Sequence, residues 1–290
     1  MTQPGPWRGA RSARAVTDLR LVASDLDGTL LRSDATLSAR TSSALRSARS
    51  AGIRVVVATA RPARVLADVL GDDDLVDAAI CANGAVRYDP VTGAQEVAHP
   101  LPSTLATFVM AEVERIVPGT FFAVETGTMV LHEPGYAYRP SRDDERHPVM
   151  TRAELIAGPL VKLMALLPHR DPAAAWDLLS PSLRSLAACT WSSGNGAARE
   201  YPAILEIAAP GVSKAAALAE LCTQWSIGSA QVAAFGDARN DLEMLLWAGA
   251  GYAVANAAAE LLAATPHRAP SNDEDGVAQT LERLLAMAER

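Results

Sequence analysis

The sequence predicts an α/β fold in which a domain built on a parallel β-sheet is interrupted by an inserted α+β domain. Short apolar runs alternate with helix-like segments near the start of the chain, hairpin-like pieces fill the middle, and the alternation resumes after residue 212. The chain has 290 residues, of which 49% are hydrophobic and 20% charged. It is therefore long enough for two domains and apolar enough to bury a core.

The chain opens with a βαβ pattern. Residues 19–24 form a short apolar run that predicts a buried strand, and residues 53–58 form a second one. Between them a helix is expected over residues 38–51, where Gly52 stops it. Another helix is expected to begin near Pro62, because proline is tolerated in a first turn, and to lead to a strand at residues 79–82.

Antiparallel pairing is expected in the middle of the chain, after the turn residues Asn83 and Gly84. Short strand candidates flank turn-forming segments there, at residues 86–88, 121–125 and 128–132. Helices are predicted over residues 103–117 and 172–179, and strands over residues 160–166 and 203–208.

The alternating pattern returns in the last part of the chain. The expected elements are a helix over residues 213–225, a strand at 232–235, a helix at 241–247, a strand at 252–255 and a last amphipathic helix. The predicted division is a disordered, arginine-rich tail at residues 1–17, a core domain at residues 18–85 and 210–290, and an inserted domain at residues 86–209.

The charge and the hydropathy argue against several classes of partner. The formal net charge is −7, so no broad basic face is expected for nucleic acid. No stretch approaches the roughly 20 uninterrupted apolar residues of a membrane span, and no apolar segment of a signal peptide follows the arginine-rich start. The three cysteines are an odd number without metal-site spacing. We expect a cytoplasmic protein without nucleic-acid or membrane partners.

Carboxylates follow two of the predicted strands. Asp25 and Asp27 come directly after the first strand, and Asp237 and Asp241 follow the strand at residues 232–235. Because open α/β sheets bind ligands at the carboxyl ends of their strands, these side chains are expected to share one crevice. One carboxylate there can attack phosphorus while a second one transfers protons. Four acids would repel one another unless a divalent cation such as Mg²⁺ lay between them.

These acids also have a structural interpretation. Aspartate and glycine are common in turns after strands, so Asp25 and Asp27 alone would not distinguish a site from a turn. Asn240 and Asp241 can cap the helix that follows them. The occurrence of acids after two strands favours the site.

Two other residues suit a phosphoryl group. Thr59 follows the strand at residues 53–58, so its hydroxyl is expected at the same edge of the sheet, although threonine is also a common cap. Lys214 opens a helix against the helix dipole, and it is one of only two lysines among 26 basic residues. A compact ammonium that contacts a phosphoryl group explains both features, and a solvated surface lysine is the alternative.

Taken in order, four segments of the chain resemble the four motifs of the haloacid dehalogenase-like phosphatases. They are Asp25-Leu26-Asp27-Gly28-Thr29-Leu30, Thr59-Ala60-Arg61, Lys214 and Gly236-Asp237-Ala238-Arg239-Asn240-Asp241. An insertion between the second and third motifs is similar to the α/β cap of the Cof-type (IIB) branch. The resemblance spans about residues 19–285. Two departures are Ala60, where this branch usually has glycine, and Val254-Ala255-Asn256-Ala257, where Met-Gly-Asn-Ala is more usual.

The resemblance implies a Rossmann-like core, a cap that sets substrate specificity, and four catalytic residues. Asp25 would be the nucleophile and a Mg²⁺ ligand. Asp27 would be the general acid and base, and it would also bind the metal through its backbone carbonyl. Thr59 and Lys214 would hold the phosphoryl group.

The resemblance also extends to the metal and the substrate. Asp237 would complete the metal site, and Asp241 would support it. Asn240 would contact the phosphate or the nearby loop, and Arg61 and Asn83 are candidates for substrate contact.

The predicted function is a Mg²⁺-dependent phosphatase that hydrolyses a small phosphorylated metabolite through an aspartyl-phosphate intermediate, with a sugar phosphate among the candidates. A phosphomutase of the same superfamily is the second hypothesis. A non-hydrolytic phospho-acceptor or binding module is a third, from a different class. The insertion and Asp27 argue against it, because a signalling domain needs neither a lid nor an acid for a leaving group. A monomer or homodimer is expected.

Overall fold

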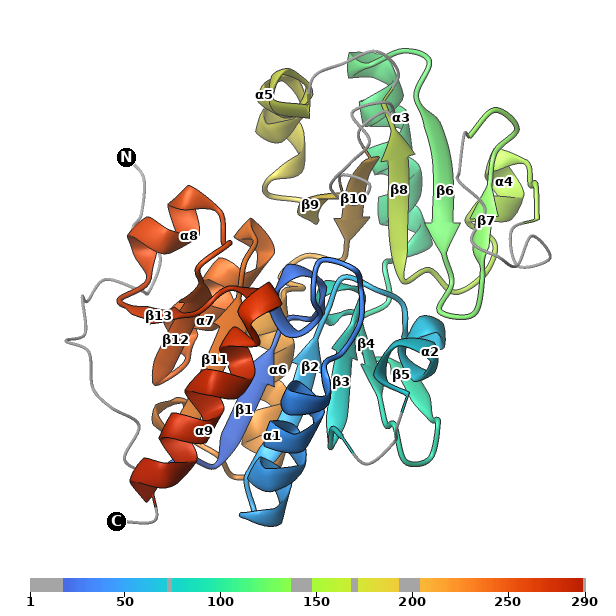
Figure 1. Ribbon diagram of the computed structural model, residues 1–290. Coiled ribbons are helices and arrows are strands. Elements are labelled where there is room, and N and C mark those ends of the chain that lie inside the picture. The colour runs from blue at the N-terminus through green and yellow to red at the C-terminus, as the bar shows by residue number, and fades with distance from the viewer. Residues whose placement is uncertain (1–17, 72–74, 137–147, 168–171, 193–203, 289–290) are drawn as a thin grey trace. The chain divides into compact units, whose positions relative to one another are not determined.

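The chain divides into two compact units in a computed structural model, which describes residues 18–71, 75–136, 148–167, 172–192 and 204–288 (Figure 1). The terminal unit comprises Met1–Val57 and Ala219–Arg290, and the central unit comprises Ala58–Leu218. The predicted tail at residues 1–17 lies outside the described residues. The predicted domain boundaries at residues 86 and 209 differ from those of the units and stay a prediction.

A parallel β-sheet forms the centre of the terminal unit. Its strands follow the order β13-β12-β11-β1-β2, and each neighbouring pair is parallel. β1 consists of buried residues only, as expected for a strand covered on both faces. The strands are β1 (Leu21–Ser24), β2 (Arg54–Ala58), β11 (Val232–Gly236), β12 (Ala250–Val254) and β13 (His267–Ala269).

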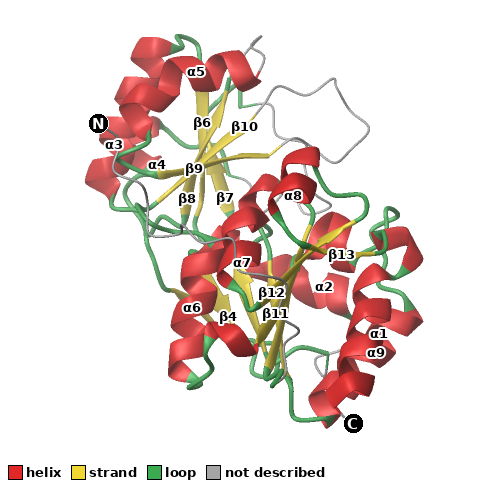
Figure 2. Ribbon diagram, turned by 90° about the vertical axis from the view of Figure 1, so that its left-hand side faces the viewer, coloured by secondary structure: helices red, strands yellow, loops and turns green. Residues whose placement is uncertain are grey.

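Helices lie on both sides of this sheet. They are α1 (Ala39–Ser50), α7 (Leu242–Trp247), α8 (Ala259–Ala264) and α9 (Gly276–Ala288). Figure 2 shows α7 on one side of β11 and β12, with α1 and α9 next to each other on the opposite side. The start of α1 is capped by Ser38, whose Oγ accepts a hydrogen bond from the Thr41 backbone at 3.0 Å. Thr41, Ala44, Leu45 and Ala48 form its buried stripe.

The central unit contains two sets of strands and the helices that pack on them. β3, β4 and β5 pair in antiparallel fashion, and a second sheet has the antiparallel order β7-β6-β8-β10-β9. The strands are β3 (Ala78–Cys81), β4 (Val86–Tyr88), β5 (Gln95–Val97), β6 (Phe121–Glu125), β7 (Val130–His132), β8 (Lys162–Leu166), β9 (Ala188–Ser192) and β10 (Ile204–Ala208). The helices are α2 (Leu66–Leu70), α3 (Ser103–Ile116), α4 (Arg152–Leu155) and α5 (Pro172–Leu183), and α6 (Lys214–Gln224) leads back to the terminal unit.

The second sheet has two unlike faces. One face contributes Phe122, Leu163 and Leu205 to a large apolar cluster, which also contains residues of α3, α4 and α5. Because successive residues of a strand point to opposite faces, Met164 and Ile204 lie on the other face, in a small apolar cluster. We call this second face the open face. This face also carries polar residues, among them Glu125, Lys162, Thr190 and Glu206.

The predicted fold class is confirmed, since the protein is a mixed α/β molecule with a parallel-sheet core. Most predicted elements lie within a few residues of the observed ones. The exceptions are β5, β9, α4, α8 and β13, which the sequence did not predict. The helix predicted near Pro62 is also shorter than expected, because a single 3₁₀ turn (Ala63–Val65) precedes the five residues of α2.

Candidate active site

The first acidic loop begins where β1 ends. Ser24 is paired with Phe235 of β11, and the Asp25 backbone continues this ladder by donating to the Phe235 carbonyl at 3.0 Å. Asp237 follows β11 directly. Because the two strands are parallel neighbours, both carboxylates leave the sheet at its carboxyl edge, as predicted.

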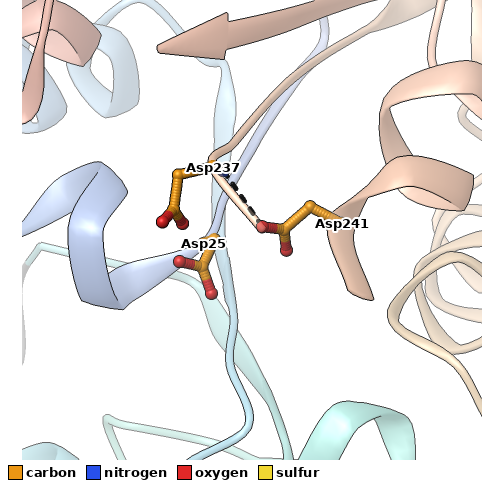
Figure 3. Close-up of side chains that lie close together, drawn as sticks. All are labelled: Asp25, Asp237 and Asp241. Carbon is orange, nitrogen blue, oxygen red and sulfur yellow. Dashed lines mark hydrogen bonds between the residues drawn. The ribbon is translucent and has the colours of Figure 1, made fainter. Parts of the chain in front are cut away.

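Three carboxylates come together at this edge. Among the residues that the structure describes, Asp25, Asp237 and Asp241 each place one oxygen within 4.8 Å of the other two. Figure 3 shows the Asp25 carboxylate close to those of Asp237 and Asp241. Asp25 is only 5% exposed, Asp241 is fully buried and Asp237 is partly exposed. We call these three residues the aspartate trio.

Backbone hydrogen bonds fix Asp241. Its Oδ2 accepts from the backbone nitrogen of Asp237 at 3.1 Å (Figure 3). It also accepts from the backbone nitrogen of Ala238 at 3.0 Å. The chain therefore folds tightly around this carboxylate. Gly236 allows this tight turn, because a Cβ at residue 236 would lie 2.4 Å from the Cβ of Asp241.

The turn after β1 positions Asp237. Thr29 Oγ1 donates to Asp237 Oδ1 at 3.0 Å. Gly28 has a φ of +77°, and a Cβ at this position would lie 2.6 Å from Asp237 Oδ2. Glycine is therefore required at this position for two reasons: the positive φ of the backbone, and the close approach of the Asp237 carboxylate.

A Gly28→Ala variant is expected to lose most of its activity and its stabilisation by Mg²⁺, because the new methyl group displaces Asp237. The matched control is Gly52→Ala. Gly52 has a φ of +78°, but a Cβ added there would meet no atom within 4 Å, so both variants carry the same backbone strain of about 1 kcal/mol. Thermal unfolding with and without Mg²⁺ compares the two. Equal responses to Mg²⁺ would contradict this role of Gly28.

Two asparagines support the same turn, and sequence reasoning assigned no role to either. Asn256 Nδ2 donates to the Gly28 carbonyl at 2.7 Å, and its Oδ1 accepts from the Asn272 backbone at 3.0 Å. The buried Asn272 side chain in turn donates to the Leu31 carbonyl at 2.9 Å. In the sequence, Asn256 is noted only within a segment that departs from the family pattern, so the structure alone shows what these two asparagines hold.

The central unit contains the predicted phosphoryl-binding residues. Thr59 is buried directly after β2, where its backbone donates to the Ile80 carbonyl at 2.8 Å and accepts from the Asn83 backbone at 2.9 Å. Its Oγ1 accepts from the Arg61 backbone at 3.1 Å. Arg61 also accepts from the Ala82 backbone at 2.9 Å. Thr59, Arg61 and Asn83 therefore form one hydrogen-bonded loop cluster.

Lys214 lies close to this loop cluster in the central unit. It is the first residue of α6 and is only 1% exposed. Gly84, with a φ of +117°, approaches the residue before it so closely that a Cβ on Gly84 would lie 2.5 Å from the Ser213 carbonyl oxygen. The turn that contains Asn83 thus packs against the start of α6. The alternative of a solvated surface lysine is wrong.

The remaining predicted residues flank the aspartate trio. Asp27 is partly exposed in the turn after β1, and its side chain is not a member of the trio. The family resemblance predicts that the Asp27 carboxylate is the general acid and base, and it assigns metal binding to the Asp27 backbone carbonyl. Asn240 is partly exposed in the short turn Arg239–Asp241 of the terminal unit.

The aspartate trio fits a hard divalent cation. Carboxylate oxygens are the ligands that Mg²⁺ prefers, and this ion usually takes one or two of them together with water and phosphate oxygens. Three carboxylates with little exposure also repel one another unless a cation or a proton compensates their charge. The donor set and the burial therefore both suit Mg²⁺.

A family comparison agrees with this geometry. The family model of the haloacid dehalogenase-like hydrolases matches residues 22–281. The chain belongs to this family. The match includes the aspartate trio, the Thr59 loop and Lys214.

Similar proteins are known from bacteria. A phosphatase-like protein of Bacillus subtilis, YxeH, is 28% identical over 284 residues, which cover 92% of this chain and 98% of the relative. The HMP-PP phosphatase of Escherichia coli is 28% identical over 249 residues, which cover 86% of this chain and 88% of the relative. The predicted enzyme class, a haloacid dehalogenase-like hydrolase of phosphoric monoesters, is confirmed.

Solved structures show the same fold. A haloacid dehalogenase-like hydrolase from B. subtilis has a TM-score of 0.74 at 25% identity, with 92% of this chain and 100% of that chain covered. A protein from Streptococcus mutans has a TM-score of 0.78 at 24% identity, with 93% and 100% covered. None of the helices in the described part of the chain is long and apolar enough to cross a membrane.

Proposed function

We propose that this protein is a Mg²⁺-dependent phosphatase that acts on a small phosphorylated metabolite through an aspartyl-phosphate intermediate. The observation that carries this proposal is the aspartate trio, in which a buried carboxylate at the end of β1 lies within 4.8 Å of two others. The name of the E. coli relative specifies a small phosphorylated substrate, HMP-PP, and supports the same class here. Sugar phosphates are among the candidates.

Asp25 is the nucleophile in this proposal. One of its carboxylate oxygens attacks phosphorus in line with the leaving oxygen, the bond to the leaving oxygen breaks, and Asp27 gives that oxygen a proton. Water then attacks the phosphorus of the aspartyl-phosphate, Asp27 takes its proton, and the bond to Asp25 breaks. Asp25 is regenerated and inorganic phosphate leaves.

The other residues bind and orient the phosphoryl group. The Thr59 hydroxyl and the Lys214 ammonium contact its oxygens, and Arg61, Asn83 and Asn240 contact the substrate. Asp25, Asp237 and Asp241, with the Asp27 carbonyl, are the residues that would hold Mg²⁺. Bound there, the ion would neutralise charge on the phosphoryl oxygens, which is the main requirement of phosphoryl transfer.

The chain organisation supports this assignment. Ser24, the residue before Asp25, is paired with Val57 in neighbouring parallel strands. Thr59 is two residues further on. We further propose that residues 86–209 are the cap that selects the substrate over a core of residues 18–85 and 210–290, in a cytoplasmic monomer or homodimer.

Phosphate release tests the proposal. The substrates would be sugar phosphates, nucleotides, flavin and pyridoxal phosphates and phenyl phosphate, each with and without Mg²⁺. We expect release that requires the metal. If no member of the panel releases phosphate at any metal concentration, hydrolysis is wrong, and transfer of a labelled phosphoryl group to Asp25 would then indicate a mutase or a phospho-acceptor.

A further inference from the structure

A row of polar side chains crosses the open face of the second sheet. Thr190 of β9 is paired with Glu206 of β10, and Lys162 of β8 is paired with Glu125 of β6. Glu206 is itself paired with Met164, two residues from Lys162 on the same face. Directly paired residues on one face lie in contact, and diagonal neighbours are within reach of long side chains. We call Thr190, Glu206, Lys162 and Glu125 the polar row.

The three charged residues of the polar row are buried and form ion pairs. Lys162 Nζ lies 2.8 Å from Glu206 Oε2, and these residues are 6% and 7% exposed. Glu125 accepts from Arg64 Nη1 at 2.6 Å and from the Gly127 backbone at 2.8 Å. A buried ion pair stabilises a fold little or not at all compared with apolar residues of similar volume, because both charges lose their hydration. Two such pairs on one face therefore favour a role beyond stability.

Contacts connect the polar row with the loop cluster that contains the predicted substrate-binding residues. Lys162 Nζ donates to the Ala60 carbonyl at 3.5 Å, between Thr59 and Arg61. Asn83 Nδ2 donates to Thr190 Oγ1 at 3.3 Å. All of these residues belong to the central unit. A phosphate held by Thr59 thus has the polar row next to it, where the rest of the substrate would lie.

The Glu206 carboxylate can accept more hydrogen bonds than it receives from the protein. A carboxylate has two oxygens that can accept about four hydrogen bonds. In the described part of the chain, the side chain of Glu206 has a single partner, Lys162. Burying a carboxylate with so few donors is costly, and donors from a ligand would remove that cost.

We infer that Glu206, held by Lys162, determines specificity by accepting hydrogen bonds from hydroxyl groups of the leaving group. This inference rests on the proposed phosphatase function. The favoured substrates are phosphate esters of polyols or sugars. Each hydroxyl of such a leaving group can donate to Glu206 and accept from Lys162, and Thr190 supplies a further hydroxyl at the end of the row.

The charges around the polar row favour neutral leaving groups over charged ones. Within the row, Glu125 and Glu206 carry negative charges and Lys162 a positive one. Arg64, which lies outside the row and is paired with Glu125, brings the sum to zero. A leaving group with a second phosphate would need an excess of positive charge, and a cationic leaving group would need an excess of negative charge. A neutral leaving group rich in hydroxyls fits best.

The test is the ratio of kcat/KM for ribitol phosphate to kcat/KM for phenyl phosphate, whose leaving group offers no additional hydroxyl. Glu206→Gln is expected to lower this ratio about 10- to 100-fold, the loss of one or two hydrogen bonds to a charged group. The matched control is Glu133→Gln. Glu133 is also a buried acid of the central unit in an ion pair, with Arg152 at 2.6 Å, and it should leave the ratio unchanged.

A second variant keeps the test decisive if Glu206→Gln does not fold. Glu206→Gln leaves the Lys162 charge buried without its partner, whereas Lys162→Met combined with Glu206→Gln removes both charges. The ratio should fall in this double variant as well. An unchanged ratio in a folded variant, or equal losses for both substrates, would overturn the inference and leave Glu206 with a structural role only.

Binding separates this inference from the proposed function. Calorimetric Kd values for ribitol phosphate and phenyl phosphate, measured with Mg²⁺ in the Asp25→Asn background, need no turnover. A preference for ribitol phosphate that Glu206→Gln abolishes supports the inference even if the wild type hydrolyses neither compound. Absence of any preference overturns it even if the protein is an active phosphatase.

Discussion

An Asp25→Asn variant is expected to fold normally and to lose about 10⁴-fold or more in kcat on any phosphate ester that the wild type hydrolyses. The amide oxygen is a poor nucleophile, and the change removes one charge from the aspartate trio. The fold should survive, because asparagine has the same shape and the backbone bond from residue 25 to the Phe235 carbonyl does not involve the side chain. Phosphate release under single-turnover conditions measures the loss.

The response to Mg²⁺ gives this prediction a second readout. In the wild type the three carboxylates repel one another without metal, so Mg²⁺ should raise the Tm. Asp25→Asn reduces that repulsion, and its Tm should therefore rise less when Mg²⁺ is added. The control is Asp34→Asn, the same change at an exposed acid of the following loop, which accepts hydrogen bonds from Thr36. If Asp25→Asn keeps a tenth of the activity, Asp25 is not the nucleophile.

The sequence was informative about the core and the acidic loops for a physical reason. Strands of a buried parallel sheet are short apolar runs, and β1 and β11 end abruptly in Asp25 and Gly236-Asp237. The change from apolar to acidic marks both the end of the strand and the edge of the sheet. The meeting of Asp25, Asp237 and Asp241 could therefore be predicted from sequence alone.

Elements that depend on distant partners were not predictable in this way. β9, with the sequence Ala-Cys-Thr-Trp-Ser, has no clear alternation and is a strand because it pairs with β10. α5 was expected to end at residue 179, yet it continues to Leu183. It does so through Pro181, although proline removes a hydrogen bond from a helix. Leu179 and Leu183 are both fully buried in the large apolar cluster, and their packing outweighs the missing hydrogen bond.

The supporting side chains were missed for a similar reason. Asn256 contacts Gly28, which is 228 positions away, and Lys162 contacts Ala60, which is 102 positions away. No local pattern encodes such pairs. The roles of Asn256 in the turn after β1 and of Glu206 in the polar row therefore required the structure.

The two lysines of the chain provide the second large expected effect. Among 26 basic residues, arginine occupies every position except 162 and 214, and both lysines are buried. A close-packed buried site accommodates a side chain of one size and shape. The lysine ammonium is a compact charge with three hydrogen-bond donors, whereas the arginine guanidinium is larger and planar. The use of lysine at these positions alone indicates that charge by itself is not sufficient there.

Lys214→Arg is therefore expected to lower kcat/KM about 100-fold or more although the charge is kept, because the guanidinium cannot occupy the position of the ammonium at the start of α6. Lys214→Met, which has a similar volume and no charge, separates packing from electrostatics. It should keep the Tm within a few degrees, because removal of a buried charge offsets the lost contacts, and it should lose about 10³-fold in kcat/KM. Near-normal kinetics of Lys214→Arg would show that any cation suffices at this position, and the argument from a compact ammonium would then be wrong.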